Sequence, residues 1–194
     1  MGLYVALADL PAEARADRTN PLYNHPGHLA SIARYRNKAF AVFLFRSELD
    51  YDHRGLDAQK KLLLDAFAGH TEWKIPHLLD AVRADPDFYF DSVSQIHMPT
   101  WHRGRIALAG DAAHCADLLS GRGTSLALSG AHFHAEELDA AGGDHTVAFE
   151  RYEQRQRPYV EFAQHSVTDG GELIPPSTQE AINARNARLQ AVAT

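Results

Sequence analysis

The residues best suited to chemistry lie between Arg105 and Ser125. Residues 105–111 are an apolar run that ends at Gly110 and Asp111. An aspartate at the end of a buried strand can accept hydrogen bonds from sugar-like hydroxyl groups. Residues 120–125 read Ser-Gly-Arg-Gly-Thr-Ser and begin a long helical pattern, and the unpaired N–H groups of a helix start attract an anionic or carbonyl oxygen. Together the two segments predict part of a cofactor site.

The partner of this site in dinucleotide-binding proteins is a glycine fingerprint. The pattern Gly-x-Gly-x-x-Gly, which opens the helix of the first βαβ unit, occurs nowhere in the sequence. We therefore expect the N-terminal Rossmann unit to be missing from this chain. The pocket for the ADP half of a dinucleotide would be missing with it.

The central block also resembles a known family. Gly110-Asp-Ala-Ala-His114, followed by Gly121-x-Gly-Thr-Ser-Leu-Ala-Leu128, is similar to the second FAD motif of the flavin-dependent aromatic hydroxylases, the p-hydroxybenzoate hydroxylase-like monooxygenases. Residues 87–97 and 101–105 resemble the strand and turn before that motif, and residues 150–158 resemble the helix after it. The resemblance covers most of the chain but only the C-terminal portion of a family member.

This resemblance implies roles for individual residues. Asp111 would bind the ribityl chain of FAD, and the backbone N–H groups near Gly123, Thr124 and Ser125 would face the flavin pyrimidine carbonyl and N1. Reduced flavin is negatively charged there, and a helix N-terminus stabilises such charge. Leu118 stands where the family usually has a proline beside the flavin. The implied cofactor-binding set is Gly110, Asp111, Leu118, Gly121, Gly123, Thr124 and Ser125, with no catalytic residue assigned because the flavin carries the oxygen chemistry.

The elements that must position these residues indicate an α+β fold. Strand patterns at 3–10, 28–35, 38–46 and 88–98 predict a mostly antiparallel substrate-domain sheet. Helical patterns cover 57–68, 76–84, 123–141, 144–170 and 178–192. Residues 106–109 lack alternation and are expected to be buried on both faces.

Three parts of the chain follow from this reading. Residues 1–98 are expected to form a partial substrate-binding sheet domain. Residues 99–143 supply the C-terminal part of the FAD-binding domain, with its strand, loop and helix. Residues 144–194 form a C-terminal helical segment.

Composition limits the partners. The formal net charge is −6 and basic residues are interleaved with acidic ones, which argues against nucleic acid. The apolar run at the N-terminus is too short to span a bilayer, so no membrane partner is expected. The single cysteine, Cys115, fits a reducing compartment and a cytoplasmic location.

Other constellations carry weaker signals. The twelve histidines suggest a metal, but His132 and His134 are two apart and point to different faces of a helix. No His-x-x-x-His or Cys-x-x-Cys pair exists, so no metal site is expected. A further set can line an aromatic-substrate pocket, with core packing as the alternative for the phenylalanines: Tyr23, His25, His28, Phe43, Phe45, Phe90 and Met98.

Two functional hypotheses follow. The first is the C-terminal part of an FAD-dependent, NAD(P)H-using monooxygenase that hydroxylates an aromatic or polyketide-like small molecule, with FAD bound weakly or not at all by this chain alone. The alternative is a non-catalytic remnant or interaction protein that pairs through an exposed sheet edge, either as a homodimer or with a separately encoded Rossmann partner. A ligand-binding module without redox chemistry is a third reading. Substrate identity, the choice between NADH and NADPH, and oligomeric state stay open.

Overall fold

The computed structural model describes the chain except residues 1, 12–13, 15–18, 50–51, 168–169 and 193–194. The described residues form two compact units. The first unit comprises residues 1–92 and 172–194, and the second comprises residues 93–171. Residues 144–194 are thus divided between the units.

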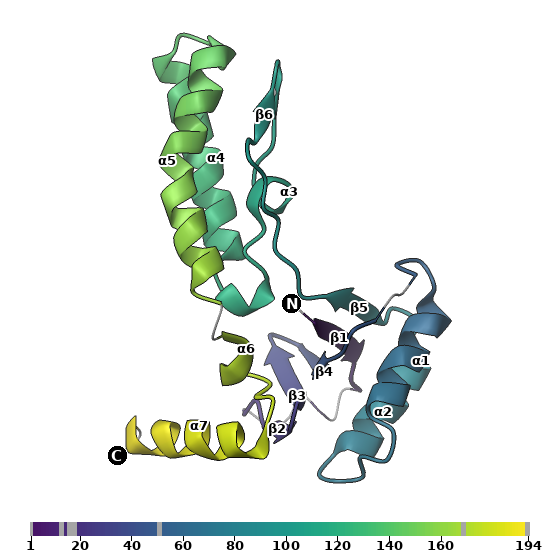
Figure 1. The fold of residues 1–194 in the computed structure, drawn as a ribbon. Coiled ribbons are helices and arrows are strands. Elements are labelled where there is room, and N and C mark those ends of the chain that lie inside the picture. The colour runs from purple at the N-terminus through teal and green to yellow at the C-terminus, as the bar shows by residue number, and fades with distance from the viewer. Residues whose placement is uncertain (1, 12–13, 15–18, 50–51, 168–169, 193–194) are drawn as a thin grey trace. The chain divides into compact units, whose positions relative to one another are not determined.

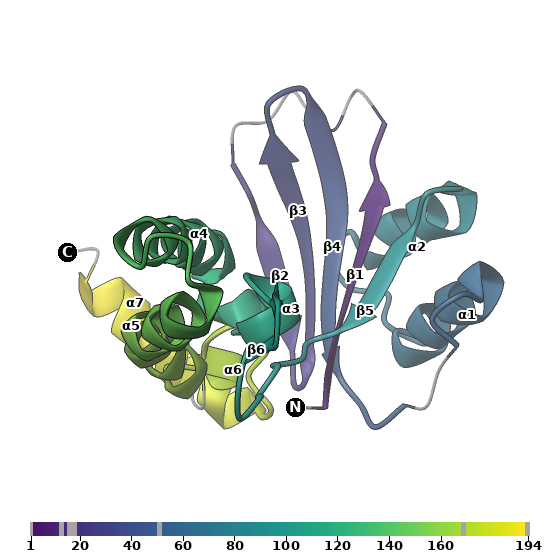
Figure 2. The same cartoon turned by 90° about the horizontal axis from the view of Figure 1, so that it is seen from above.

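The first unit is built on a five-stranded sheet in the order β2-β3-β4-β1-β5 (Figures 1 and 2), and each pairing of neighbours is antiparallel. The strands are β1 (Leu3–Asp9), β2 (Leu22–His25), β3 (His28–Tyr35), β4 (Lys38–Arg46) and β5 (Tyr89–Ser92). The expected α+β class with a mostly antiparallel sheet is confirmed.

Helices α1 (Leu56–Ala66) and α2 (Ile75–Ala84) lie next to each other and cover one face of this sheet. Apolar residues alternate along β1 and β4 because every second side chain of a strand points to the same face. The helix-covered face carries Ala6, Ala41 and Phe43, which are fully buried. These side chains form a continuous core with the helices.

The C-terminal residues return to the same unit. The sequence boundary between the units falls within α6 (Gly170–Leu173), and α7 (Gln179–Val192) belongs to the first unit. The buried guanidinium of Arg185 on α7 donates to Asn24 Oδ1 of β2 at 2.8 Å and to the Leu173 carbonyl at 2.9 Å. A buried cation needs such acceptors, so these bonds fix α7 on the edge of the sheet.

The second unit consists of two short strands and a helical pair. Its elements are β6 (His102–Arg103), β7 (Ile106–Ala107), α3 (Asp111–His114), the 3₁₀ turn η2 (Leu118–Ser120), α4 (Gly123–Ala140) and α5 (His145–His165). Gly142 and Gly143, with φ of +59° and +86°, end α4 as expected. Asp144 caps α5 by accepting from the Thr146 N–H at 3.0 Å.

Two sequence expectations are wrong. Residues 88–98 do not form one strand, because β5 ends at Ser92, whose partner Tyr4 lies next to the start of β1. Residues 106–109 are not buried on both faces, since Ile106 is 69% exposed. In the part of the chain that the structure describes, β7 pairs with β6 alone, so nothing covers it as a central strand would be covered.

Close packing of α4 on α5 holds the start of α4 in place. A Cβ added at Gly130 would be in van der Waals contact with Gln156 Nε2 at 3.5 Å and with His114 Nε2 at 3.6 Å. Gln156 is fully buried; its Nε2 donates to the Leu126 carbonyl at 2.9 Å and its Oε1 accepts from Ser129. Neither α4 nor any other helix among the described residues combines the length and hydropathy of a membrane span.

Candidate functional site

The second unit contains a cavity of about 640 Å³ beside the N-terminus of α4, a size typical of small-molecule sites. Five of the seven residues of the expected cofactor set line it. The lining residues are Asp111, Cys115, Asp117, Leu118, Gly121, Gly123, Thr124, Ala127 and Leu128. Gly110 and Ser125 are the two members of the expected set that do not.

Asp111 is the first residue of α3 and its side chain is exposed to the cavity. Gly110, the residue before it, has φ of +62° and ψ of −143°, a conformation that residues with a Cβ rarely adopt. A Cβ at Gly110 would also lie 3.4 Å from Ala127 Cβ. Gly110 therefore acts from behind the cavity, by turning the chain so that Asp111 faces it.

The N-terminus of α4 meets Asp111 at the same edge of the cavity. A Cβ built on Gly123 would lie 3.9 Å from Asp111 Oδ1. Arg122, the N-cap of α4, makes no side-chain cap, so the first-turn N–H groups stay available to a ligand. Ser125 is exposed, its hydroxyl donates to the Arg122 carbonyl at 2.9 Å, and it is not one of the lining residues.

Gly121 lets the backbone approach a ligand closely. It adopts the left-handed conformation with φ of +60°, and no atom lies within 4 Å of a Cβ built there. Two leucines add an apolar wall: Leu118 is 59% exposed and Leu128 is 69% exposed. Large exposed apolar side chains at a cavity are typical of a surface that a flat ring system covers.

Asp117 is a lining residue that sequence reasoning missed. It is buried and has φ of +64°. Its Oδ1 accepts from the N–H groups of Leu119 at 2.7 Å and Ser120 at 3.1 Å, and its Oδ2 accepts from Gln95 at 2.9 Å. An aspartate directly before an apolar pair is a common cap signal, so the pattern Asp-Leu-Leu-Ser could have indicated it.

His114 lies behind the cavity in the core of the second unit. Its ring centroid is 4.7 Å from that of Trp101, and its Nε2 has no hydrogen-bond partner among the described residues. Burial lowers the pKa of His114 below its ordinary value. The ring is therefore neutral at pH 7 and packs α3 against the helical pair.

The residues considered for an aromatic-substrate pocket do not form one set. Phe43, Phe45 and Phe90 are buried in the core of the first unit, which confirms the core-packing alternative. Met98 belongs to the second unit. His25 and His28 lie together with a third histidine, described below.

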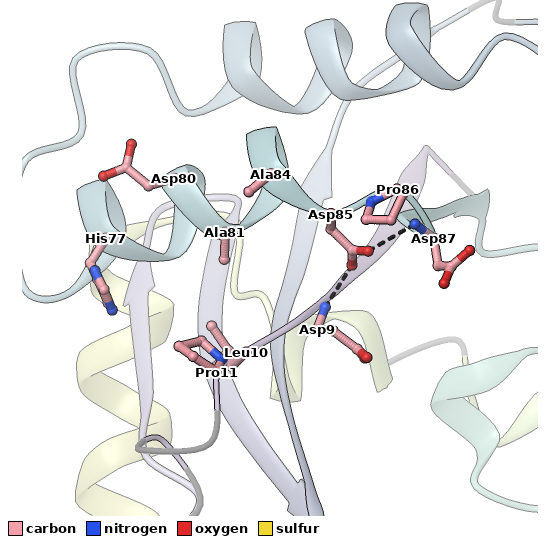
Figure 3. A pocket seen from close by; sticks show the side chains of 10 residues that line it. All are labelled: Asp9, Leu10, Pro11, His77, Asp80, Ala81, Ala84, Asp85, Pro86 and Asp87. Carbon is pink, nitrogen blue, oxygen red and sulfur yellow. Dashed lines mark hydrogen bonds between the residues drawn. The ribbon is translucent and has the colours of Figure 1, made fainter.

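The first unit has its own cavity of about 610 Å³, between the end of β1 and α2 (Figure 3). Four aspartates line it, namely Asp9, Asp80, Asp85 and Asp87. The carboxylate of Asp85 is already hydrogen-bonded to two backbone N–H groups. The Asp85 carboxylate accepts from the N–H of Asp9 at 2.7 Å and from the N–H of Asp87 at 2.8 Å. These bonds close the turn between α2 and β5, which is a structural role.

The chain is similar in sequence to known flavin-dependent monooxygenases. No protein-family model matches the chain. It is 40% identical over 164 residues to a flavin-dependent monooxygenase of an unknown prokaryotic organism, which covers 83% of this chain and 42% of the relative. It is 36% identical over 106 residues to the FAD-dependent monooxygenase asL6 of Sarocladium schorii, which covers 55% of this chain and 25% of the relative.

The fold is also similar to that of a solved structure. The crystal structure of tetracycline destructase Tet(55) superimposes with a TM-score of 0.83 at 36% identity, over 98% of this chain and 52% of that one. The chain is homologous to flavin-dependent monooxygenases, which confirms the family resemblance of residues 110–128. It spans about half the length, or less, of the relatives it matches.

Proposed function

We propose that residues 111–124 bind the isoalloxazine and ribityl parts of FAD, and that the chain is part of a monooxygenase acting on an aromatic or polyketide-like small molecule. One observation carries the proposal. The Asp111 carboxylate and the uncapped N-terminus of α4 lie at one cavity, with Asp111 Oδ1 3.9 Å from the Cβ position of Gly123.

Each group has a distinct part in this proposal. Asp111 accepts hydrogen bonds from ribityl hydroxyls. The N–H groups of Gly123 and Thr124 donate to the pyrimidine edge of the ring, and the partial positive charge of the α4 N-terminus stabilises negative charge there. Leu118 and Leu128 cover apolar ring surface. Bound FAD supplies the electrons and the oxygen chemistry, with NAD(P)H as the proposed source of those electrons.

The cavity fits the group. Gly121 and Gly123 present bare backbone to it, and side chains at these positions would occupy the space that a ring needs. The substrate class rests on the relatives, among them a tetracycline destructase. A fused-ring, polyketide-like substrate is consistent with that name.

The ADP half of FAD needs a second binding element. The Gly-x-Gly-x-x-Gly pattern is absent from the 194 residues, so we propose that a dinucleotide-binding unit outside them contributes it. This unit is either joined to the chain or separately encoded. The chain alone then holds FAD only through the flavin end.

Flavin titration tests the proposal. A hydrogen bond to a charged group contributes about 1.5–3 kcal/mol, so Asp111→Ala should weaken binding of FAD and riboflavin about tenfold to a hundredfold. Quenching of flavin fluorescence measures the affinity. Asp139→Ala, an exposed aspartate near the far end of α4, is the matched control and should bind as the unaltered chain does. Equal affinities of the Asp111→Ala and Asp139→Ala variants would contradict the proposal.

A second function has its own observation. Ile106 is 69% exposed on β7, and β7 pairs only with β6 among the described strands. Such an edge is suited to pairing with another chain, which would make this an interaction protein. A stable dimer that binds no flavin would favour this reading over the first.

A further inference from the structure

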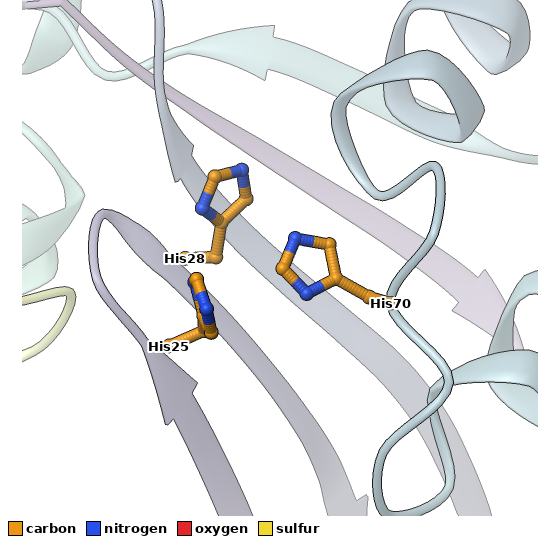
Figure 4. Close-up of side chains that lie close together, drawn as sticks. All are labelled: His25, His28 and His70. Carbon is orange, nitrogen blue, oxygen red and sulfur yellow. The ribbon is translucent and has the colours of Figure 1, made fainter.

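Three histidines from two segments of the first unit lie together at one end of its sheet (Figure 4). His25 is the last residue of β2 and His28 is the first of β3, across the Pro26–Gly27 turn. His70 follows α1 in the chain. One ring nitrogen from each residue lies within 4.8 Å of the others.

A hydrogen bond orients one ring, and a carboxylate lies beside another. His28 Nδ1 is 3.0 Å from the Pro26 carbonyl oxygen. Because a carbonyl only accepts, Nδ1 carries the hydrogen and Nε2 keeps the lone pair. His70 Nδ1 lies 3.7 Å from the Glu72 carboxylate. A backbone carbonyl or a carboxylate behind the ring is the usual arrangement for a metal-binding histidine.

The residues around the three histidines leave the cluster accessible to an ion from solvent. The Phe67 ring packs against two of the histidines, with its centroid 5.1 Å from that of His28 and 5.8 Å from that of His70. A phenylalanine side chain has no atom that binds a metal ion, so it does not compete with one for the histidine nitrogens. His25 is exposed and leaves the cluster open on its own side.

We propose that His25, His28 and His70 bind a divalent transition-metal ion, with zinc the best fit. Three imidazoles with one open position occupied by water are a known zinc ligand set, and nitrogen donors also suit copper and nickel. Zn–N bonds of about 2.05 Å at tetrahedral angles place the nitrogens about 3.3 Å apart. The rings therefore close inward by side-chain rotation on binding, for which exposed His25 has the most room.

The ion would join the β2–β3 hairpin to the segment after α1. These two parts are distant in sequence, so a bond between them stabilises the folded first unit by mass action. Sequence spacing did not indicate the site, because two ligands face each other across a hairpin and the third is far along the chain. The site is independent of the flavin cavity, which lies in the other unit.

Zinc titration of the chelator-treated chain tests this proposal. Calorimetry should show one zinc ion per chain, and zinc should raise Tm. His25→Ala and His70→Ala should each weaken zinc binding at least tenfold and remove the rise in Tm. His77→Ala removes an exposed histidine from α2 of the same unit and should behave as the unaltered chain. His25 is exposed, so His25→Ala tests the ligand without loss of core packing.

Two results would overturn the metal site. One is the absence of saturable zinc binding to the unaltered chain. The other is zinc binding by the His25→Ala and His70→Ala variants as tight as that of His77→Ala. Cobalt substitution adds a direct readout, because Co²⁺ held by three imidazoles and water gives visible absorption that the His25→Ala variant should lack. Loss of flavin binding in Asp111→Ala would leave all of these results unchanged.

Discussion

Gly121 and Gly123 flank the same cavity but are glycines for different reasons. Gly121 has φ of +60°, where a side chain strains the backbone whatever space surrounds it. Gly123 begins α4 in ordinary helical geometry, and a Cβ there would meet only Asp111 Oδ1 at 3.9 Å, which is van der Waals contact. Both glycines line the cavity, but the backbone conformation requires a glycine only at Gly121, whereas Gly123 only leaves room for a ligand.

This difference predicts that valine lowers the stability of the fold at Gly121 but not at Gly123. Gly123→Val should leave Tm close to that of the unaltered chain and weaken flavin binding at least tenfold, because the added methyl groups fill the cavity. Gly121→Val should lower stability by about 1–2 kcal/mol or more, the cost of a left-handed conformation. Thermal unfolding and flavin fluorescence measure the two effects. A Gly123→Val variant that binds flavin normally would contradict the assigned cavity edge.

Residue types predicted the residues that line the cavity better than the hydrogen bonds that hold them in place. Gly110, Asp111 and Gly123 stand out in the sequence because a strand, a turn and a helix start leave recognisable residues. The local pattern around Asp117 indicates only a turn cap, whereas its bond to Gln95 comes from a separate segment. Long-range hydrogen bonds of this kind leave no local pattern.

At the scale of elements, Glu153 is one of the α5 residues that bind the segment before β6, together with Arg157 and Gln164. Glu153 Oε2 accepts from the Trp101 N–H at 2.8 Å and from the Thr100 hydroxyl at 3.1 Å, and its other oxygen pairs with Arg157. Burial alone raises the pKa of Glu153, but these hydrogen bonds and the Arg157 charge outweigh it, so the pKa lies below the ordinary value of 4.5.

The lowered pKa predicts a pH dependence of stability. A carboxyl whose pKa is lower in the folded state stabilises the fold above its unfolded pKa, and this stability is lost as the pH falls through the folded value. Glu153→Gln should therefore lower Tm at pH 7 and flatten the fall of Tm below about pH 4.5. Tm measured from pH 3 to pH 8 tests this. A Glu153→Gln curve parallel to that of the unaltered chain would show that the carboxylate has no such role.

Elements with strong periodicity were predicted well, and those defined by their partners were not. The patterns at 28–35 and 38–46 are β3 and β4, whose side chains alternate between the two faces of the sheet. β2 has only four residues, Leu-Tyr-Asn-His, with exposed ends, and the strand patterns read from the sequence did not include it. Residues 106–109 have the composition of a buried strand, but among the described residues only β6 pairs with them.

At the scale of the whole molecule, the chain consists of a sheet unit and a second unit that contains the proposed flavin cavity. It is homologous to about half of a flavin-dependent monooxygenase, and its cavity is suited to the flavin end of FAD. We therefore expect riboflavin, which lacks the ADP part, to bind this chain about as well as FAD does.

The most direct test of the central claim is to locate flavin on the chain by NMR. Riboflavin titrated into the ¹⁵N-labelled protein should shift the backbone amide signals of Gly121, Gly123 and Thr124 first, together with that of Asp111. Signals from the sheet of the first unit should shift least. Shifts confined to the first unit, or an unchanged spectrum at saturating riboflavin, would contradict the assignment of the cavity beside α4 as a flavin site.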